Sequence, residues 1–139
     1  MKNMKKFEIL EHKADLKIKV FGKTKRELFE NAMIGMLKAG KYQKNPKSQI
    51  SKLKTKIKSL DLPSLLVDFL SEILYLVETK KLVFEKVEFE KFSDKEIEAI
   101  LIGKELKRMG VHIKGVTYHE LNIHQKRNGE WEATILFDI

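Results

Sequence analysis

The chain has 139 residues, of which 42% are hydrophobic and 35% are charged, the balance of a globular protein with a charged surface. It contains no cysteine, which excludes disulfides, thiolate catalysis and zinc–thiolate sites. No apolar run is long enough for a signal peptide or a membrane span, so we expect a cytoplasmic protein without a membrane partner, folded as one domain over residues 1–139.

The net charge of +8 is concentrated between Glu30 and Asp61, a window that contains no acidic residue. A localised basic stripe is typical of a surface that meets RNA phosphates or an acidic partner. The alternative is a solvated lysine face that keeps the protein in solution, and the sequence leaves both interpretations open. This lysine stripe consists of Lys38, Lys41, Lys44, Lys47, Lys52, Lys54, Lys56 and Lys58.

The first elements in chain order are two strands and a helix. Apolar residues predict a short strand over 7–10, and alternation of apolar with mostly polar residues predicts a second strand over 16–22. Thr24 followed three residues later by Glu27 is a capping-box pattern. Apolar residues at helical spacing follow it and predict a helix that ends near residues 39–40.

The second half of the chain continues with a strand, a helix and then strands only. Alternation with lysines predicts a strand over 52–58, and Asp61 with Pro63 predicts the start of a second helix. From Leu82 onward the apolar period shifts towards two, which predicts strands near 82–92, 96–106, 116–125 and 131–138. This order is an α+β pattern, so we expect a mostly antiparallel sheet with two helices packed on it.

The dipeptide Asn128-Gly129 predicts a two-residue type I′ hairpin turn, because both positions of that turn need positive φ. Counting outward from such a turn sets His119 opposite Asp138. Directly opposed residues point to the same face, with Cβ atoms roughly 5 Å apart. A bulge anywhere along the hairpin would change this register.

The end of the chain gathers negative charge. Ile139 follows Asp138, so its terminal carboxylate lies close to the Asp138 side chain. Clustered anions need a compensating cation, and oxygen ligands without thiolates suit Ca²⁺ or Mg²⁺. The alternative is a solvated terminus with an exposed aspartate that holds no ion.

Four segments, in order along the chain, resemble those of the archease family. Residues 11–15 (Glu-His-Lys-Ala-Asp) resemble its His-Thr-Ala-Asp signature, and residues 65–75 are similar to its central helix. Residues 113–119 resemble its Lys-x-x-Thr-Tyr-His segment, and residues 131–139 resemble a terminal strand that closes on Phe-Asp-Ile. Together these segments are specific, and they imply an archease-like fold.

The resemblance also implies a function. Archeases promote guanylylation and multiple turnover of the GTP-dependent RNA-splicing ligase of the RtcB type, in tRNA splicing and RNA repair, and are not themselves catalysts. The chain is therefore expected to be an accessory activator rather than an enzyme. Its partner would be that ligase, and tRNA or another RNA would meet the basic surface.

Site residues follow from the same motifs. The resemblance makes Asp15, Asp138 and the terminal carboxylate of Ile139 the ligands of a divalent metal, with Ca²⁺ as the expected ion. It makes Lys114 the residue needed for ligase activation. Leu16-Lys17 replaces the family's usual Ile-Gly after the first motif.

His12 and His119 match motif positions near this site. We expect them to hydrogen-bond the carboxylates and fix their orientation. The alternative is a mixed nitrogen and oxygen site for zinc, although no third histidine or thiolate completes a strong one. Lys13 replaces the family's usual threonine and adds a cation that would weaken divalent binding or partly substitute for it.

Two other functions compete with the activator. One is a metal-dependent hydrolase that uses Asp15, Asp138 and His119, although the sequence has no nucleophile elbow, Walker-type loop or zincin motif. The other is an RNA-binding module built on the lysine stripe, residues 38–58. It predicts RNA affinity that falls steeply with salt and survives the loss of Asp15 or Asp138.

Overall fold

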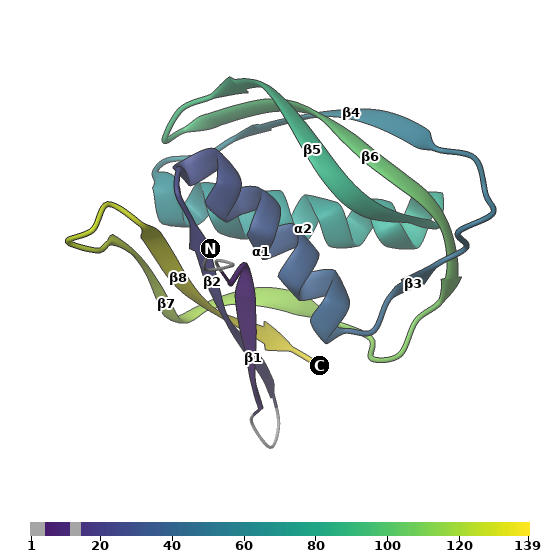
Figure 1. Ribbon diagram of the computed structural model, residues 1–139, viewed down its shortest axis with the longest axis horizontal. Coiled ribbons are helices and arrows are strands. Elements are labelled where there is room, and N and C mark those ends of the chain that lie inside the picture. The colour runs from purple at the N-terminus through teal and green to yellow at the C-terminus, as the bar shows by residue number, and fades with distance from the viewer. Residues whose placement is uncertain (1–4, 12–14) are drawn as a thin grey trace.

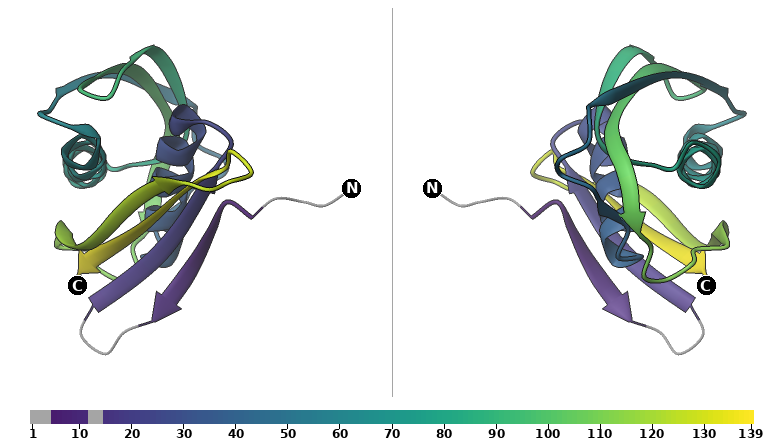
Figure 2. Two further views of the ribbon diagram at one scale, coloured as in Figure 1. Left: turned by 90° about the vertical axis from the view of Figure 1, so that its left-hand side faces the viewer. Right: turned by 90° about the vertical axis from the view of Figure 1, so that its right-hand side faces the viewer.

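The computed structural model describes residues 5–11 and 15–139, and within them it contains two helices and eight strands. The strands form two antiparallel sheets, and both helices lie between them (Figures 1 and 2). The predicted α+β class with antiparallel pairing and two packed helices is confirmed, with the strands divided between two sheets. The elements are β1 (Phe7–Glu11), β2 (Asp15–Gly22), α1 (Lys25–Ala39), β3 (Gln43–Lys44), β4 (Ser51–Lys58), α2 (Leu62–Lys80), β5 (Leu82–Phe92), β6 (Glu96–Arg108), β7 (Gly115–Gln125) and β8 (Trp131–Asp138).

The first sheet has the strand order β1-β2-β8-β7. β2 lies in its interior and alternates as the sequence predicts, with Leu16, Ile18 and Val20 buried against the helices. Its other face carries Asp15, Lys17 and Lys19, which are partly exposed. The sheet therefore presents one apolar face to the core and one polar face outward.

The second sheet is built around β6, which pairs with β5 on one side and with β4 and the two-residue β3 on the other. β3 is absent from the strands predicted from sequence. The four lysines of β4 are exposed, and Lys56 lies directly opposite Glu98 with 3.8 Å between their charged atoms. This part of the lysine stripe is thus partly neutralised by neighbouring strands.

Both helix starts follow the predicted capping. Thr24 Oγ1 accepts a hydrogen bond from the Glu27 N–H at 3.1 Å, and Glu27 Oε1 accepts one from the Lys23 N–H at 3.2 Å. Asp61 caps α2 by accepting from the Ser64 N–H at 2.8 Å. That hydrogen bond lowers the pKa of Asp61 because it favours the carboxylate form.

Thr24→Ala is expected to lower the free energy of unfolding by about 1 kcal/mol, because the Glu27 N–H loses its acceptor. Urea unfolding followed by circular dichroism measures this change. Thr24→Ser keeps the hydroxyl and is expected to lose much less. Equal losses in both variants would show that the cap does not stabilise α1.

The helices and the second sheet meet in an aromatic cluster. Phe29 of α1 lies 5.7 Å from Phe69 of α2 and 5.0 Å from Phe92 of β5, measured between ring centroids. Phe69 also lies 6.2 Å from Phe89 of β5. Phe29 and Phe69 have no exposed surface, so this cluster joins three elements in the core.

None of the helices in the described residues combines the length and the apolar character that crossing a membrane requires.

Candidate functional site

Three strands of the first sheet bring the predicted metal ligands into one row. Asp15 opens β2 and is paired with Asp138 near the end of β8. On the other side of β8, Asp138 is paired with Gly115, the first residue of β7. Residues far apart in the sequence therefore meet at one edge of the sheet, beside the end of the chain (Figure 1).

The two aspartates share the outer face of the sheet. Directly paired residues project to the same side with Cβ atoms roughly 5 Å apart, and Asp15 alternates with the buried Leu16. Asp15 Oδ1 is buried, whereas Asp138 is exposed. A Cβ built on Gly115 would lie 4.0 Å from Asp138 Oδ2, so the Asp138 carboxylate points towards β7.

Lys114 and Ile139 flank this row. The Lys114 N–H donates a hydrogen bond of 2.7 Å to the backbone carbonyl of Asp138, which fixes the lysine backbone beside the aspartate. The Lys114 side chain is exposed. Ile139 follows Asp138 and has 39% of its surface exposed. The predicted activation residue and the predicted ligands thus lie at the same edge.

The predicted hairpin turn is wrong. Gly129 has a φ of 90°, but Asn128 is not among the described residues with positive φ, so a type I′ turn does not form. The Gly129 N–H donates to the Lys126 carbonyl at 3.0 Å, and the Lys126 N–H donates to the Glu130 carbonyl at 2.8 Å. These bonds define a three-residue loop in which only the glycine adopts the left-handed conformation.

The predicted pairing of His119 with Asp138 is also wrong. Thr117 is opposite Leu136 and Asn122 is opposite Thr134, so residues 118–121 of β7 face a single residue of β8. This bulge of four residues opposite one, together with the longer turn, gives Asp138 the partner Gly115 instead. His119 lies in the bulge and is exposed.

The bulge adds residues that the sequence did not single out. Glu120 has a φ of 57°, and its carboxylate lies 3.1 Å from Lys17 Nζ of β2, two strands away. Thr117 and Leu136 pair two residues along the strands from Gly115 and Asp138, and Leu136 is only 5% exposed. Thr117 Oγ1 is buried, with no hydrogen-bond partner among the described residues. The one feature of the sequence that pointed to this bulge was the mixture of polar and apolar residues on both faces of the predicted hairpin.

The donors expected at this position are all oxygen atoms. His12 and Lys13 lie outside the described residues. Within residues 5–11 and 15–139, histidine, aspartate and glutamate side chains form no group of three or more able to hold a metal. Asp15 and Asp138 supply two carboxylates on one face, and the terminal carboxylate is the third oxygen donor expected from sequence. An all-oxygen set of this kind suits Ca²⁺ or Mg²⁺ rather than zinc.

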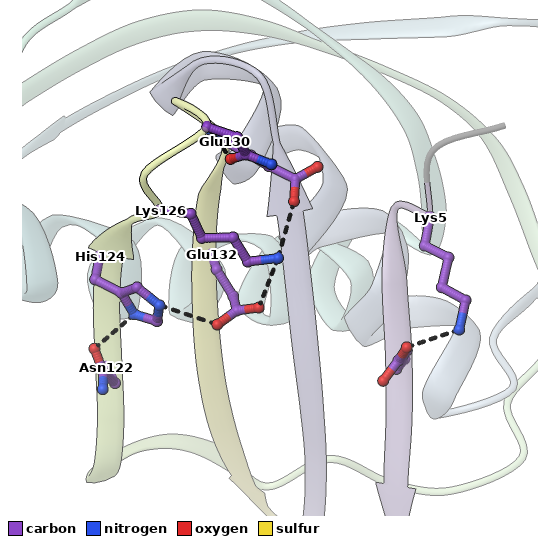
Figure 3. Close-up of polar contacts among 8 residues, drawn as sticks. Lys5, Asn122, His124, Lys126, Glu130 and Glu132 are labelled. Carbon is purple, nitrogen blue, oxygen red and sulfur yellow. Dashed lines mark hydrogen bonds and ion pairs between the residues drawn. The ribbon is translucent and has the colours of Figure 1, made fainter. Parts of the chain in front are cut away.

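The opposite end of the same hairpin is a closed network of charges (Figure 3). Lys126 Nζ lies 3.2 Å from Glu130 and 3.5 Å from Glu132, and His124 Nε2 lies 3.0 Å from Glu132. The hydrogen bond to Glu130 raises the pKa of Lys126. Lys126 also stands 5.2 Å from the ring centroid of Phe21. These groups satisfy one another, so the network holds the turn against β2.

Fold and site together define a small α+β protein with a pair of carboxylates where two neighbouring strands of a sheet begin and end. Residues 7–139 match the model of the archease protein family. The chain is 37% identical to the archease of Methanosarcina acetivorans over 97% of both chains. It is 31% identical to that of Pyrococcus furiosus, covering 98% of this chain and all of the relative.

Solved structures agree with this match. The solution structure of Methanobacterium thermoautotrophicum protein 1598 aligns with a TM-score of 0.70 and 25% identity, over 98% of this chain and all of that one. The crystal structure of a Thermotoga maritima archease, described as a possible chaperone, has the same fold, with a TM-score of 0.69 and 17% identity over both full chains. The chain belongs to the archease family.

Proposed function

We propose that this archease activates the GTP-dependent RNA-splicing ligase of the RtcB type, promoting its guanylylation and repeated turnover without catalysing a reaction itself. The observation that carries the proposal is the pairing of Asp15 with Asp138 on one sheet face, with the Lys114 backbone bonded to Asp138. Because such a partner acts on RNA in tRNA splicing and repair, the proposal also places the protein in the cytoplasm.

In this proposal Asp15, Asp138 and the terminal carboxylate of Ile139 hold a divalent cation, with Ca²⁺ as the expected ion. When bound, the ion would supply the positive charge that offsets three neighbouring carboxylates. The chain's own contribution is strand pairing, which holds Asp15 and Asp138 together. Because the two carboxylates cannot move apart, their repulsion favours a cation between them. The occupied site would then present an ordered chain end to the ligase.

Lys114 is proposed to make the contact that activates the ligase. Its backbone is fixed by the hydrogen bond to the Asp138 carbonyl, and its side chain is exposed. A lysine ammonium is a compact point charge suited to a phosphate of GTP or to a carboxylate of the ligase. In this proposal the bound metal would fix the position of the Lys114 ammonium relative to the ligase.

The histidines have supporting roles in the proposal. His12 would orient Asp15 through a hydrogen bond, as histidines and carboxylates do around metal sites. His119 is exposed in the β7 bulge, and strand pairing does not bring it to Asp138. A hydrogen bond from His119 to Asp138 therefore does not follow from strand pairing.

A guanylylation assay tests the proposal. Purified ligase is incubated with GTP and Ca²⁺, with and without this protein, and the covalent ligase–GMP adduct and multiple-turnover RNA ligation are followed over time. The protein is expected to raise both rates. Unchanged rates would show that it is not an activator of this ligase.

Lys114→Gln is expected to reduce the stimulation at least about tenfold, since it removes a charge positioned for the reacting partner. Lys95→Gln is the matched control, because Lys95 is an exposed lysine in the turn between β5 and β6. The control should keep full stimulation. If both variants stimulate equally, Lys114 has no specific role.

A further inference from the structure

A cavity of about 630 Å³ opens where α1 ends, away from the carboxylate row. This volume lies within the range of sites for small organic ligands. In Figure 1 the chain runs from the end of α1 into β3, on the right-hand side of the molecule, where β5 also begins. The cavity is lined by Ile34, Leu37, Lys38, Lys41, Tyr42, Gln43, Lys44, Val83, Phe84 and Glu85.

The lining combines an apolar floor with a basic rim. Leu37, Val83 and Phe84 are buried side chains that line it from two elements. Three exposed lysines of the lysine stripe, Lys38, Lys41 and Lys44, stand around it, and only Lys44 has an acidic partner there, Glu85. The cavity therefore suits a ligand that has both an apolar ring and negative charge.

A second depression of about 530 Å³ is lined in part by Leu82, which precedes Val83 of the first depression in the sequence. It adds Lys47, Lys80 and Lys81, with Glu105 as its acidic residue. The two depressions together carry six lysines and two glutamates. This number of lysines suits a polyanion better than a single free phosphate.

The wall of the first cavity is held firmly in place. Lys41 has a φ of 57°, a conformation that costs a residue with a side chain free energy and that surrounding contacts must maintain. The Gly110 N–H donates to the Lys41 carbonyl at 3.1 Å, and the Tyr42 N–H donates to the Leu37 carbonyl at 3.0 Å. A Cβ on Gly40 would lie 2.4 Å from the Tyr42 ring, so this turn needs glycine there.

We propose that these depressions bind single-stranded RNA, with one nucleotide in the first cavity and the adjoining phosphates along the lysines. The base would pack against the apolar lining of the cavity, and Lys38, Lys41 and Lys44 would each meet a phosphate. An acidic peptide would use the lysines but has no planar base to place against the apolar lining. This proposal does not rest on the ligase role.

The proposed RNA site is connected to the carboxylate row. The Tyr42 hydroxyl accepts a hydrogen bond from the Ile113 N–H at 3.2 Å, and the next residue, Lys114, donates its N–H to Asp138. Burial raises the pKa of Tyr42, so the hydroxyl stays neutral at physiological pH. Residues 113–114 thus lie between the two sites.

Fluorescence anisotropy with a labelled oligouridylate of about ten nucleotides tests the proposal on the full chain. The test variant combines Lys38→Gln, Lys41→Asn and Lys44→Gln, with asparagine at 41 because it tolerates positive φ. The matched control combines Lys52→Gln, Lys54→Gln and Lys56→Gln, which removes the same charge from exposed lysines of β4. Circular dichroism checks that both variants are folded.

The test variant is expected to bind at least about tenfold more weakly, and its salt dependence between about 50 and 200 mM should be shallower by about 2 in log–log slope, since each phosphate contact contributes about 0.7. The control should keep a slope near that of the unsubstituted chain. Equal losses in both variants would overturn the proposal, because binding would then depend on charge alone. So would the absence of RNA binding at low salt, or tighter binding of a poly-glutamate peptide of equal charge.

Discussion

Asp138→Asn is expected to abolish the rise in melting temperature that Ca²⁺ gives the unsubstituted chain, while leaving the fold intact. Asp138 is exposed and lies at the end of β8, so the substitution removes a charge from the proposed metal site without opening the core. At a Ca²⁺ concentration about a hundredfold above Kd, binding stabilises the folded state by about 2.7 kcal/mol, and this is the contribution that should disappear. Thermal unfolding with Ca²⁺ and with a chelator measures it.

Asp94→Asn is the control for this experiment. Asp94 is an exposed aspartate whose carboxylate lies 2.7 Å from Lys25 Nζ, remote in sequence from the proposed ligands. It should keep the full response to Ca²⁺. If Asp138→Asn responds to Ca²⁺ as the unsubstituted chain does, or if that chain shows no response, the metal site is not formed by these residues.

Asp138→Asn also distinguishes ligase activation from RNA binding. The activator proposal expects Asp138→Asn to lose ligase stimulation, because the metal site would no longer order the chain end. An RNA-binding role in the lysine-lined depressions expects RNA affinity to survive this substitution, since Asp138 lines neither depression. Measuring both activities on one variant therefore shows whether the two sites act independently or through residues 113–114.

Phe69→Ala is expected to lower the free energy of unfolding by about 3–5 kcal/mol. Phe69 is fully buried and contacts rings from α1 and β5, so its removal leaves a cavity where three elements meet. Urea denaturation followed by tryptophan fluorescence and circular dichroism measures the loss. Phe69→Leu fills much of the same space and should lose clearly less.

A loss below about 1 kcal/mol in Phe69→Ala would contradict this prediction, because it would place the site among tolerant surface positions. A large loss would instead confirm that the helix pair and the second sheet form one cooperative core. It would also show that the position of the first cavity depends on that core, since Phe84 of its floor lies on the same strand as Phe89 and Phe92.

Much of the secondary structure follows from local signals in the sequence. Thr24 and Asp61 start helices because their side chains accept hydrogen bonds from backbone N–H groups three residues later. β2 follows from its alternation, because a half-buried strand needs one apolar face. These interactions involve residues close in sequence, which is why the pattern alone specified them. β3 escaped prediction because a two-residue strand has no periodicity to detect.

The partner of Asp138 on β7 depends on tertiary structure. Asn128-Gly129 correctly marked a hairpin, but the turn took one more residue than the dipeptide indicated. The bulge at residues 118–121 then changed the register again. Neither change has a local signature strong enough to predict, since a bulge forms where side-chain packing compensates the lost ladder bonds.

The sequence by itself determined every element except β3, the order of those elements, the α+β class and the chemical character of the carboxylates and the lysine stripe. The tertiary structure decided which of these side chains meet. Asp138 is paired with Gly115 and not with His119. A buried tyrosine and three lysines line a cavity that no sequence motif predicted. The reason is physical: local hydrogen bonding and periodicity act over a few residues, whereas register and cavities are set by packing between elements distant in the chain.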